Sequence, residues 1–144
     1  AGTILWAAGV AASPLGAGLP AERDRAGRVK VAPDLSVPGV PEVFVIGDLA
    51  HAVDRGRPVP GVAPAAKQMG RFVAGRIRAR IAGDTRPAAF RYTDFGNLAT
   101  IGRLAAVVDL RGFRFSGAPA WLFWLFAHLV FLIGFRNRFV VLLN

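Results

Sequence analysis

The feature that most constrains this chain is an apolar run of 18 residues, from Ala118 to Phe135, without Lys, Arg, Asp or Glu. As an α-helix, a run of this length is about 27 Å long, close to the roughly 30 Å of a bilayer's hydrocarbon core. It is apolar on nearly every side, so it must be deeply buried in protein or in lipid. The run therefore predicts either a core helix or a helix that contacts a membrane.

Charge and aromatic content favour the membrane. The chain has 18 Lys and Arg against 9 Asp and Glu, a net charge of +9, and 53% of its residues are hydrophobic. A basic chain prefers anionic partners, and ordinary nucleic-acid binders are much less apolar than this one. Nine of the 15 aromatic residues lie between Phe113 and Phe139. We therefore exclude nucleic acid as a partner and expect an anionic lipid surface.

The side chains expected to anchor this region in the membrane are Trp121, Trp124, Arg136 and Arg138. Tryptophan prefers the headgroup level of a bilayer, and arginine is attracted to anionic lipid. The bare sequence permits a membrane-spanning helix almost as well as a helix that lies in the interface. His128, a polar side chain in the middle of the run, either relays a proton or makes a structural hydrogen bond, which is the commoner role.

Before residue 87 the pattern is typical of an α/β fold. Residues 3–6 and 42–46 are short apolar runs that predict buried strands, the second buried on both faces as in a parallel sheet. Residues 29–31 alternate in polarity and predict a short half-buried strand. The segments 11–27 and 53–60 are predicted loops, because proline and glycine interrupt them.

A helix is predicted to begin at Pro64 and to end at Gly83, since proline suits a first turn and glycine a C-terminus. An apolar side chain recurs every four residues along it, at Met69, Val73, Ile77 and Ile81. This stripe predicts the face that packs against the core.

After Pro87 the pattern changes to short strands, predicted at residues 90–95, 98–101, 105–110 and 113–115. Turns at Gly102-Arg103 and Arg111-Gly112 would join the last three as an antiparallel meander.

The chain contains no cysteine. This excludes disulfides, thiolate metal sites and redox-active cysteine pairs, and it fits a reducing compartment. We assign neither a metal site nor a catalytic residue to the chain. It begins at Ala1 without an initiator Met, and its single methionine is Met69, so we expect a piece of a longer protein.

Two segments could hold a ligand. Gly47-Asp48 follows the predicted strand 42–46, where open α/β sheets bind ligands and a carboxylate can accept hydrogen bonds from sugar hydroxyls. The commoner role of such an aspartate is to cap a turn. The predicted helix start, Ala63-Pro64-Ala65, offers free N–H groups and small side chains against which a flat ligand could lie. The alternative is an ordinary amphipathic helix.

Four segments, taken in order, resemble the type II NADH dehydrogenases, which are single-subunit NADH:quinone oxidoreductases. VFVIGDLA (43–50) is similar to the family's second FAD-binding motif, and PGVAPAAKQMG (60–70) to the segment where its flavin and quinone sites meet. YTDFGNLATIGR (92–103) resembles a signature of its C-terminal sheet. AWLFW (120–124) and GFRNR (134–138) resemble its membrane-anchoring tail.

The resemblance implies an α/β flavoprotein with two Rossmann-like dinucleotide-binding domains, a small antiparallel β segment and C-terminal membrane-binding helices. Residues 1–10 would end the NADH-binding domain, residues 11–86 would form the C-terminal half of the FAD-binding domain, residues 87–117 the β segment and residues 118–144 the membrane-anchoring helices. NADH would reduce FAD, and the flavin would reduce a membrane quinone without proton pumping. We expect a monotopic protein on the cytoplasmic face of the inner membrane, with a homodimer as a further expectation.

On the family pattern, Gly47 and Asp48 would bind FAD, with the carboxylate on the ribitol. The backbone of Ala63, Pro64 and Ala65 would lie against the isoalloxazine ring. A helix start would stabilise the negative charge that a reduced flavin gains at that edge.

The quinone site would include Pro64 and Gln68, the latter matching the second of two family glutamines. Ala8 and Gly9 would line the nicotinamide side. The family commonly has glutamine where this chain has Pro64, and proline lacks both the side-chain amide and the backbone donor. Quinone binding at that position is therefore expected to differ.

Two other functions are compatible with parts of the sequence. A sulfide:quinone oxidoreductase would use redox cysteines, which this chain lacks. A basic membrane-docking module without a cofactor would explain the charge and the aromatic tail. No GxGxxG motif follows a strand here, so both nucleotide-phosphate loops are missing, and the chain alone is not expected to be a competent enzyme.

Overall fold

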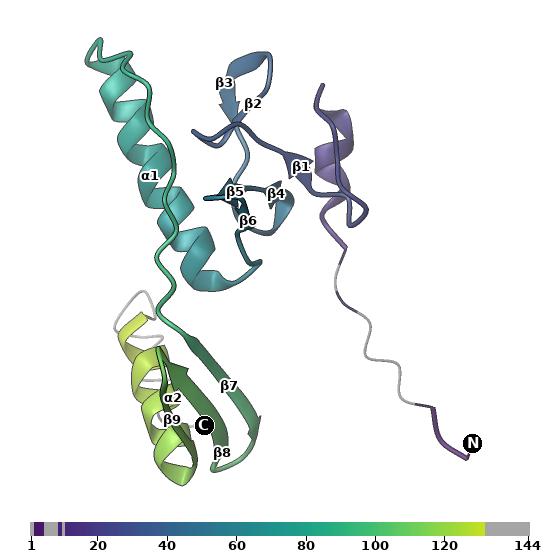
Figure 1. Ribbon diagram of the computed structural model, residues 1–144, viewed down its shortest axis with the longest axis vertical. Coiled ribbons are helices and arrows are strands. Elements are labelled where there is room, and N and C mark those ends of the chain that lie inside the picture. The colour runs from purple at the N-terminus through teal and green to yellow at the C-terminus, as the bar shows by residue number, and fades with distance from the viewer. Residues whose placement is uncertain (1, 5–8, 10, 132–144) are drawn as a thin grey trace. The chain divides into compact units, whose positions relative to one another are not determined.

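The computed structural model describes residues 2–4, 9 and 11–131, which fall into two compact units divided between Thr93 and Asp94. The first unit contains helix α1, and the second contains helix α2 (Figure 1). Each unit has a hydrophobic core of its own.

The N-terminal unit is built from three two-stranded pairings. The strands are β1 Val29–Lys30, parallel to β4 Ala50–His51; β2 Ser36–Val37, antiparallel to β3 Val40–Phe44; and β5 Val53–Asp54, antiparallel to β6 Arg57–Pro58. Two 3₁₀ turns complete it, η1 Pro14–Gly18 and η2 Gly47–Leu49. The prediction of a short strand near residue 29 is confirmed, and the segment 11–27 is largely loop as predicted.

The prediction of a strand at 42–46 buried on both faces of a parallel sheet is wrong. β3 is antiparallel to β2, with Val37 opposite Val40, so Pro38 and Gly39 alone form the turn. Gly39 has a φ of 81°, which a proline-glycine turn requires. The residues of β3 are exposed or half-buried, and it is Val45, just past its end, that is buried.

Two other local predictions in this unit are wrong. The predicted loop 53–60 contains the β5–β6 hairpin, whose turn residues Arg55 and Gly56 both have positive φ. Arginine rarely adopts that conformation, so its sequence signal is weak. In the predicted strand 3–6, residues 3 and 4 form no strand and Ile4 is exposed. Residues 5 and 6 lie outside the described residues.

Helix α1, Ala63–Ile81, confirms the predicted helix start and end. Gly83 has a φ of 80°, and its N–H donates to the carbonyl of Arg80 while the N–H of Asp84 donates to that of Ala79. This pattern closes the helix C-terminus as a Schellman motif.

Only the first half of the predicted apolar stripe of α1 is buried. Met69 and Val73 lie in the core, whereas Ile77 is 45% exposed and Ile81 is 83% exposed. The second half of α1 is instead held by polar contacts, because Arg80 binds Asp34 and lies over the Phe44 ring.

The C-terminal unit is a three-stranded antiparallel meander covered by one helix. Its elements are β7 Asn97–Gly102, β8 Ala105–Leu110, β9 Phe113–Gly117 and α2 Ala118–Phe131. This confirms the predicted meander. Small side chains let the helix approach the sheet closely, since Ala120 on α2 and Ala106 on β8 are almost completely buried.

The predicted strand at 90–95 is not a strand, and the chain that follows α1 runs as an extended segment alongside that helix (Figure 1). Among residues 11–131 no helix is both long and apolar enough to cross a membrane. The sequence also predicts that Arg136-Asn137-Arg138 separates two short tail helices, and these residues lie outside the described part of the chain.

Candidate functional site

Gly47 is fixed against the first half of α1. Its φ is 68°, and its N–H donates to Sδ of Met69 over 3.2 Å. A Cβ at this position would lie 3.6 Å from Cβ of Ala66. The buried sulfur of Met69 is therefore the acceptor for the Gly47 N–H, which has no carbonyl partner within the turn.

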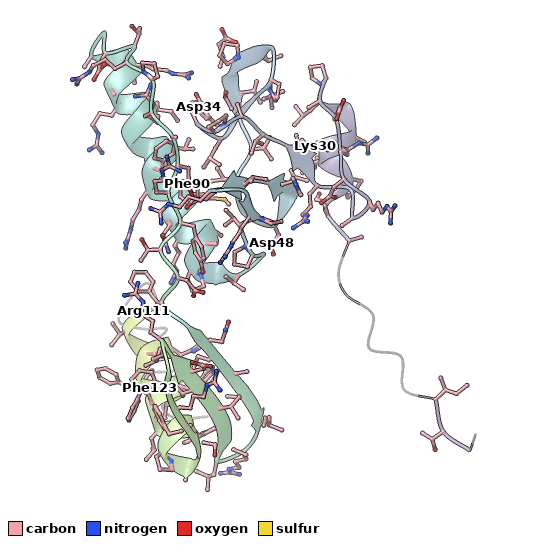
Figure 2. The ribbon with its side chains drawn as sticks, in the orientation of Figure 1. Lys30, Asp34, Asp48, Phe90, Arg111 and Phe123 are labelled. Atoms are coloured by element: carbon pink, nitrogen blue, oxygen red, sulfur yellow. The ribbon has the colours of Figure 1, made fainter. Side chains whose placement is uncertain are left out.

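Asp48 follows directly and is exposed beside the loop that leads into α1 (Figure 2). A Cβ on Gly61 would lie 3.6 Å from its Oδ1, so glycine keeps the approach to this carboxylate open. Within the described part of the N-terminal unit, the other aspartates all form ion pairs, at Asp24, Asp34, Asp54 and Asp84. Asp48 has no such partner among the described residues, which leaves its carboxylate available to a ligand.

The start of α1 carries an uncompensated positive end. The N-cap is Val62, which makes no side-chain cap, and no acidic residue lies in the first turn. Ala63 and Pro64 are exposed, whereas Ala65 as a whole residue is only 1% exposed and belongs to the core. A ligand at this helix start would therefore contact Ala63 and Pro64 rather than Ala65.

Gln68 lies one turn further along α1, and both ends of its amide bind Thr93. Nε2 donates to the carbonyl of Thr93, and Oε1 accepts from its N–H, each over 2.9 Å. The structure thus brings this predicted quinone-site residue to a backbone segment that lies 25 residues away in sequence.

Asp54 was not identified from the sequence. Its Oδ1 binds Nη1 of Arg91 over 2.7 Å, and its Oδ2 accepts from the N–H of Tyr92 over 3.1 Å. The hydrogen bond from Arg91 lowers the pKa of this carboxyl, with burial opposing and the Tyr92 N–H assisting. No local pattern signals this contact, because the partners are 37 and 38 residues apart.

A second charged cluster joins the loop before β1 to β4. Oδ2 of Asp24 binds Nε of Arg28 over 2.7 Å and Nδ1 of His51 over 3.0 Å. Burial acts to raise the pKa of Asp24, but hydrogen bonds from the backbone and guanidinium of Arg28 and from the N–H of Ala26 outweigh it and lower that pKa to about 2. The cluster ties the loop before β1 to the strand that follows Asp48.

In the C-terminal unit the two predicted tryptophan anchors are half-buried. Trp121 packs against the core of its unit, and the Trp124 ring lies on the His128 ring with centroids 4.0 Å apart. The most exposed large side chains of α2 are instead Leu122, Phe126 and Val130. Their spacing of four places them on one helix face, a pattern that the uniformly apolar sequence concealed.

Three of the predicted residues, Ala8, Arg136 and Arg138, lie outside the described residues. Gly9 is exposed, and a Cβ on it would meet no other atom within 4 Å.

Comparison with known proteins gives a consistent result along the chain. A family model described as the NDH2 C-terminal domain matches residues 95–144. The chain is 49% identical over 147 aligned residues to the type II NADH:quinone oxidoreductase Ndh of Mycobacterium tuberculosis, with 97% of this chain and 31% of that protein covered. NdhA of the same organism is 47% identical, with 96% of this chain and 30% of that protein covered.

A plant relative is more distant. The internal alternative NAD(P)H-ubiquinone oxidoreductase A1 of Arabidopsis thaliana is 31% identical, with 99% of this chain and 32% of that protein covered. The chain spans about a third of the length of these curated relatives. The chain belongs to the type II NADH:quinone oxidoreductase family.

Proposed function

We propose that the complete protein transfers electrons from NADH to a membrane quinone, with FAD as its cofactor and without proton pumping. The two mycobacterial relatives named above are NADH:quinone oxidoreductases, which supports the overall reaction. In this proposal the complete protein has two Rossmann-like domains, and Ala8 and Gly9 line the nicotinamide side. When bound, FAD supplies an acceptor for hydride from NADH and a donor of electrons to quinone.

The observation that carries the proposal is the exposed, unpaired carboxylate of Asp48 beside the uncapped start of α1. A carboxylate accepts hydrogen bonds from the hydroxyls of a ribitol chain. The helix start offers the exposed backbone at Ala63 and the positive end of the helix dipole to negative charge on a ring system. The residues present therefore fit a flavin, with Gly47 and Gly61 keeping space for it.

Pro64 changes what this turn can offer to a quinone. It has no N–H and no side-chain amide, so the surface that this exposed residue presents is apolar. We propose that the ring of Pro64 contacts the quinone head by packing rather than by hydrogen bonding.

The reaction is tested with the complete protein in membranes, by NADH oxidation with and without an added quinone. Quinone-dependent oxidation is expected. A flavin-bearing preparation with no quinone-dependent rate would contradict the proposal.

The flavin site is tested separately with Asp48→Ala. We expect the purified variant to lose most of its FAD, measured by absorbance and by the flavin released on denaturation. Asp84→Ala is the matched control, because that aspartate pairs with Arg86 beyond the far end of α1 and should retain FAD. Equal flavin content in the two variants would refute the role of Asp48.

We further propose that the C-terminal unit docks on anionic lipid at the cytoplasmic face of the inner membrane, as a monotopic homodimer. The exposed face of α2 at Leu122, Phe126 and Val130 supports this docking. Phe126→Asn should reduce sedimentation with vesicles that contain phosphatidylglycerol, whereas Ile77→Asn on α1 should not. Protease protection that puts residue 144 on the opposite side of the membrane from residue 90 would disprove the monotopic arrangement. Light scattering in detergent measures the molar mass of the complete protein and so tests the dimer.

A further inference from the structure

The extended segment 90–93 is held by three hydrogen bonds to side chains and one to backbone, and not by a strand ladder. Of its backbone groups, the N–H of Tyr92 donates to Asp54, and both the N–H and the carbonyl of Thr93 bind Gln68. The N–H of Phe90 donates to the carbonyl of Pro33 over 2.8 Å. These hydrogen bonds take the place of a strand ladder, and no described strand pairs with this segment.

Gln68 binds this segment as a neighbouring strand would. Its carbonyl and its NH₂ group face the N–H and carbonyl of one residue, Thr93, at equal distances of 2.9 Å. A glutamine that turned toward another ligand would give up both of these hydrogen bonds at once. The geometry therefore favours a Gln68 that stays on Thr93.

Asp54 reaches the same segment from the β5–β6 hairpin. It accepts from the Tyr92 N–H and from Arg91, and both contacts stabilise its charged form. Its side chain is only 9% exposed, so its position is restricted. Gln68 on α1 and Asp54 on the hairpin thus bind adjacent residues of the segment 90–93.

Packing aligns this segment with the face of α1 that begins at Pro64. Pro64, Gln68 and Phe72 are spaced by four and share that face. The Phe90 ring meets the Phe72 ring edge-on with centroids 5.7 Å apart, and Phe90 is 5% exposed. Figure 1 shows the extended segment running alongside α1, and Figure 2 shows Phe90 on it.

We propose that Gln68 and Asp54 are positioning residues that clamp residues 90–93 along α1. The clamped segment forms one side of the quinone site beside the first turn of α1. Gln68 then affects the quinone by holding this segment in place and does not bind the quinone itself. The inference rests on the proposed function for its catalytic consequence, but the clamp can be measured without any turnover.

The test uses Gln68→Ala and Asp54→Ala in the complete flavin-bearing protein. Both should accelerate amide hydrogen exchange in residues 90–93 and raise the quinone KM about fivefold, the loss expected from one hydrogen bond, with the NADH KM unchanged. Gln68→Glu should have an intermediate effect, because it keeps the acceptor for the Thr93 N–H and loses the donor. Asp84→Ala should change neither exchange nor KM.

The outcomes separate the clamp from direct binding. If Gln68 contacts the quinone, Gln68→Ala raises the quinone KM while Asp54→Ala leaves it unchanged, and the proposal is overturned. Unchanged exchange at residues 90–93 in both variants also overturns it. If the unaltered protein shows no quinone reduction, the proposed function fails, whereas faster exchange in both variants still supports the clamp. Flavin content and the melting temperature identify a variant that fails to fold, and Gln68→Glu then carries the test.

Discussion

The two units of this chain are stabilised in different ways. In the N-terminal unit each pairing has only two strands, and charged side chains join distant segments, as in the pairs of Asp24 with His51, Asp34 with Arg80 and Asp54 with Arg91. In the C-terminal unit a continuous three-stranded ladder packs on one apolar helix. The first construction leaves polar groups and a helix start available to a ligand. The second leaves large apolar side chains outside, which suits a surface contact.

The comparison predicts that the C-terminal unit depends most on backbone geometry. Gly96 has a φ of 98°, and a Cβ on it would lie 2.0 Å from the carbonyl oxygen of Asp109. Because the obstacle is backbone, Gly96→Ala should destabilise this unit by more than about 2 kcal/mol. Hydrogen exchange of residues 97–110 in the complete protein measures this as a loss of protection of about thirtyfold or more.

Gly16→Ala is the corresponding change in the N-terminal unit. A Cβ there would meet Cγ2 of Val29 at 2.9 Å and Cδ1 of Leu49 at 3.1 Å, which are side-chain ends that can move. We expect a cost of only about 1 kcal/mol, seen in residues 13–31. An effect as large as that of Gly96→Ala would remove this distinction between the units.

The same distinction decides what the sequence could predict. The meander was predictable because its strands are consecutive and its turns carry glycine or a polar residue, and α1 was predictable from Pro64 and Gly83. The pairing of β2 with β3 was not predicted, although Pro38 and Gly39 between them are typical turn residues. Strand burial was overestimated at 42–46 because an apolar run does not say which elements cover it.

The candidate site divides in the same way. Asp48 and the start of α1 follow from local sequence, since a strand end, a glycine and a proline lie close together. The contacts of Gln68 and Asp54 with residues 91–93 do not, because 25 to 38 residues separate the partners. Long-range side-chain contacts to backbone leave no periodic pattern that sequence analysis could detect.

A smaller effect is expected from Met69→Leu in the N-terminal unit. The substitution conserves volume but removes the acceptor for the Gly47 N–H, so it should cost about 1 kcal/mol and weaken FAD retention. Val73→Ala is the control, because it removes core volume one turn away and leaves the Gly47 contact intact. If Val73→Ala loses as much flavin as Met69→Leu at equal protein stability, the sulfur has no specific role at Gly47.

Acid should weaken the N-terminal unit at its polar junctions. The folded pKa of Asp24 is lowered to about 2 from an ordinary value of 3.8. Its contribution to stability is therefore complete above pH 3.8 and is lost as the pH falls toward 2. Exchange of residues 22–31, corrected for intrinsic rates, should increase over this range, and Asp24→Asn should abolish that dependence. A variant with the same acid response as the unaltered protein would contradict this role.

The smallest expected effect tests a feature that the two units share. Leu104 in the β7–β8 turn has a φ of 56°, and Arg55 in the β5–β6 turn has a φ of 49°, and both side chains are exposed. Asparagine tolerates this conformation better than leucine or arginine, so Leu104→Asn and Arg55→Asn should each stabilise their hairpin by about 0.5 kcal/mol. Slower exchange at the hairpin amides measures this gain. Equal gains in hairpin stability would show that turn strain is local and independent of how each unit is held together. A gain confined to Leu104→Asn would mean that Arg55 makes a compensating contact near Asp54.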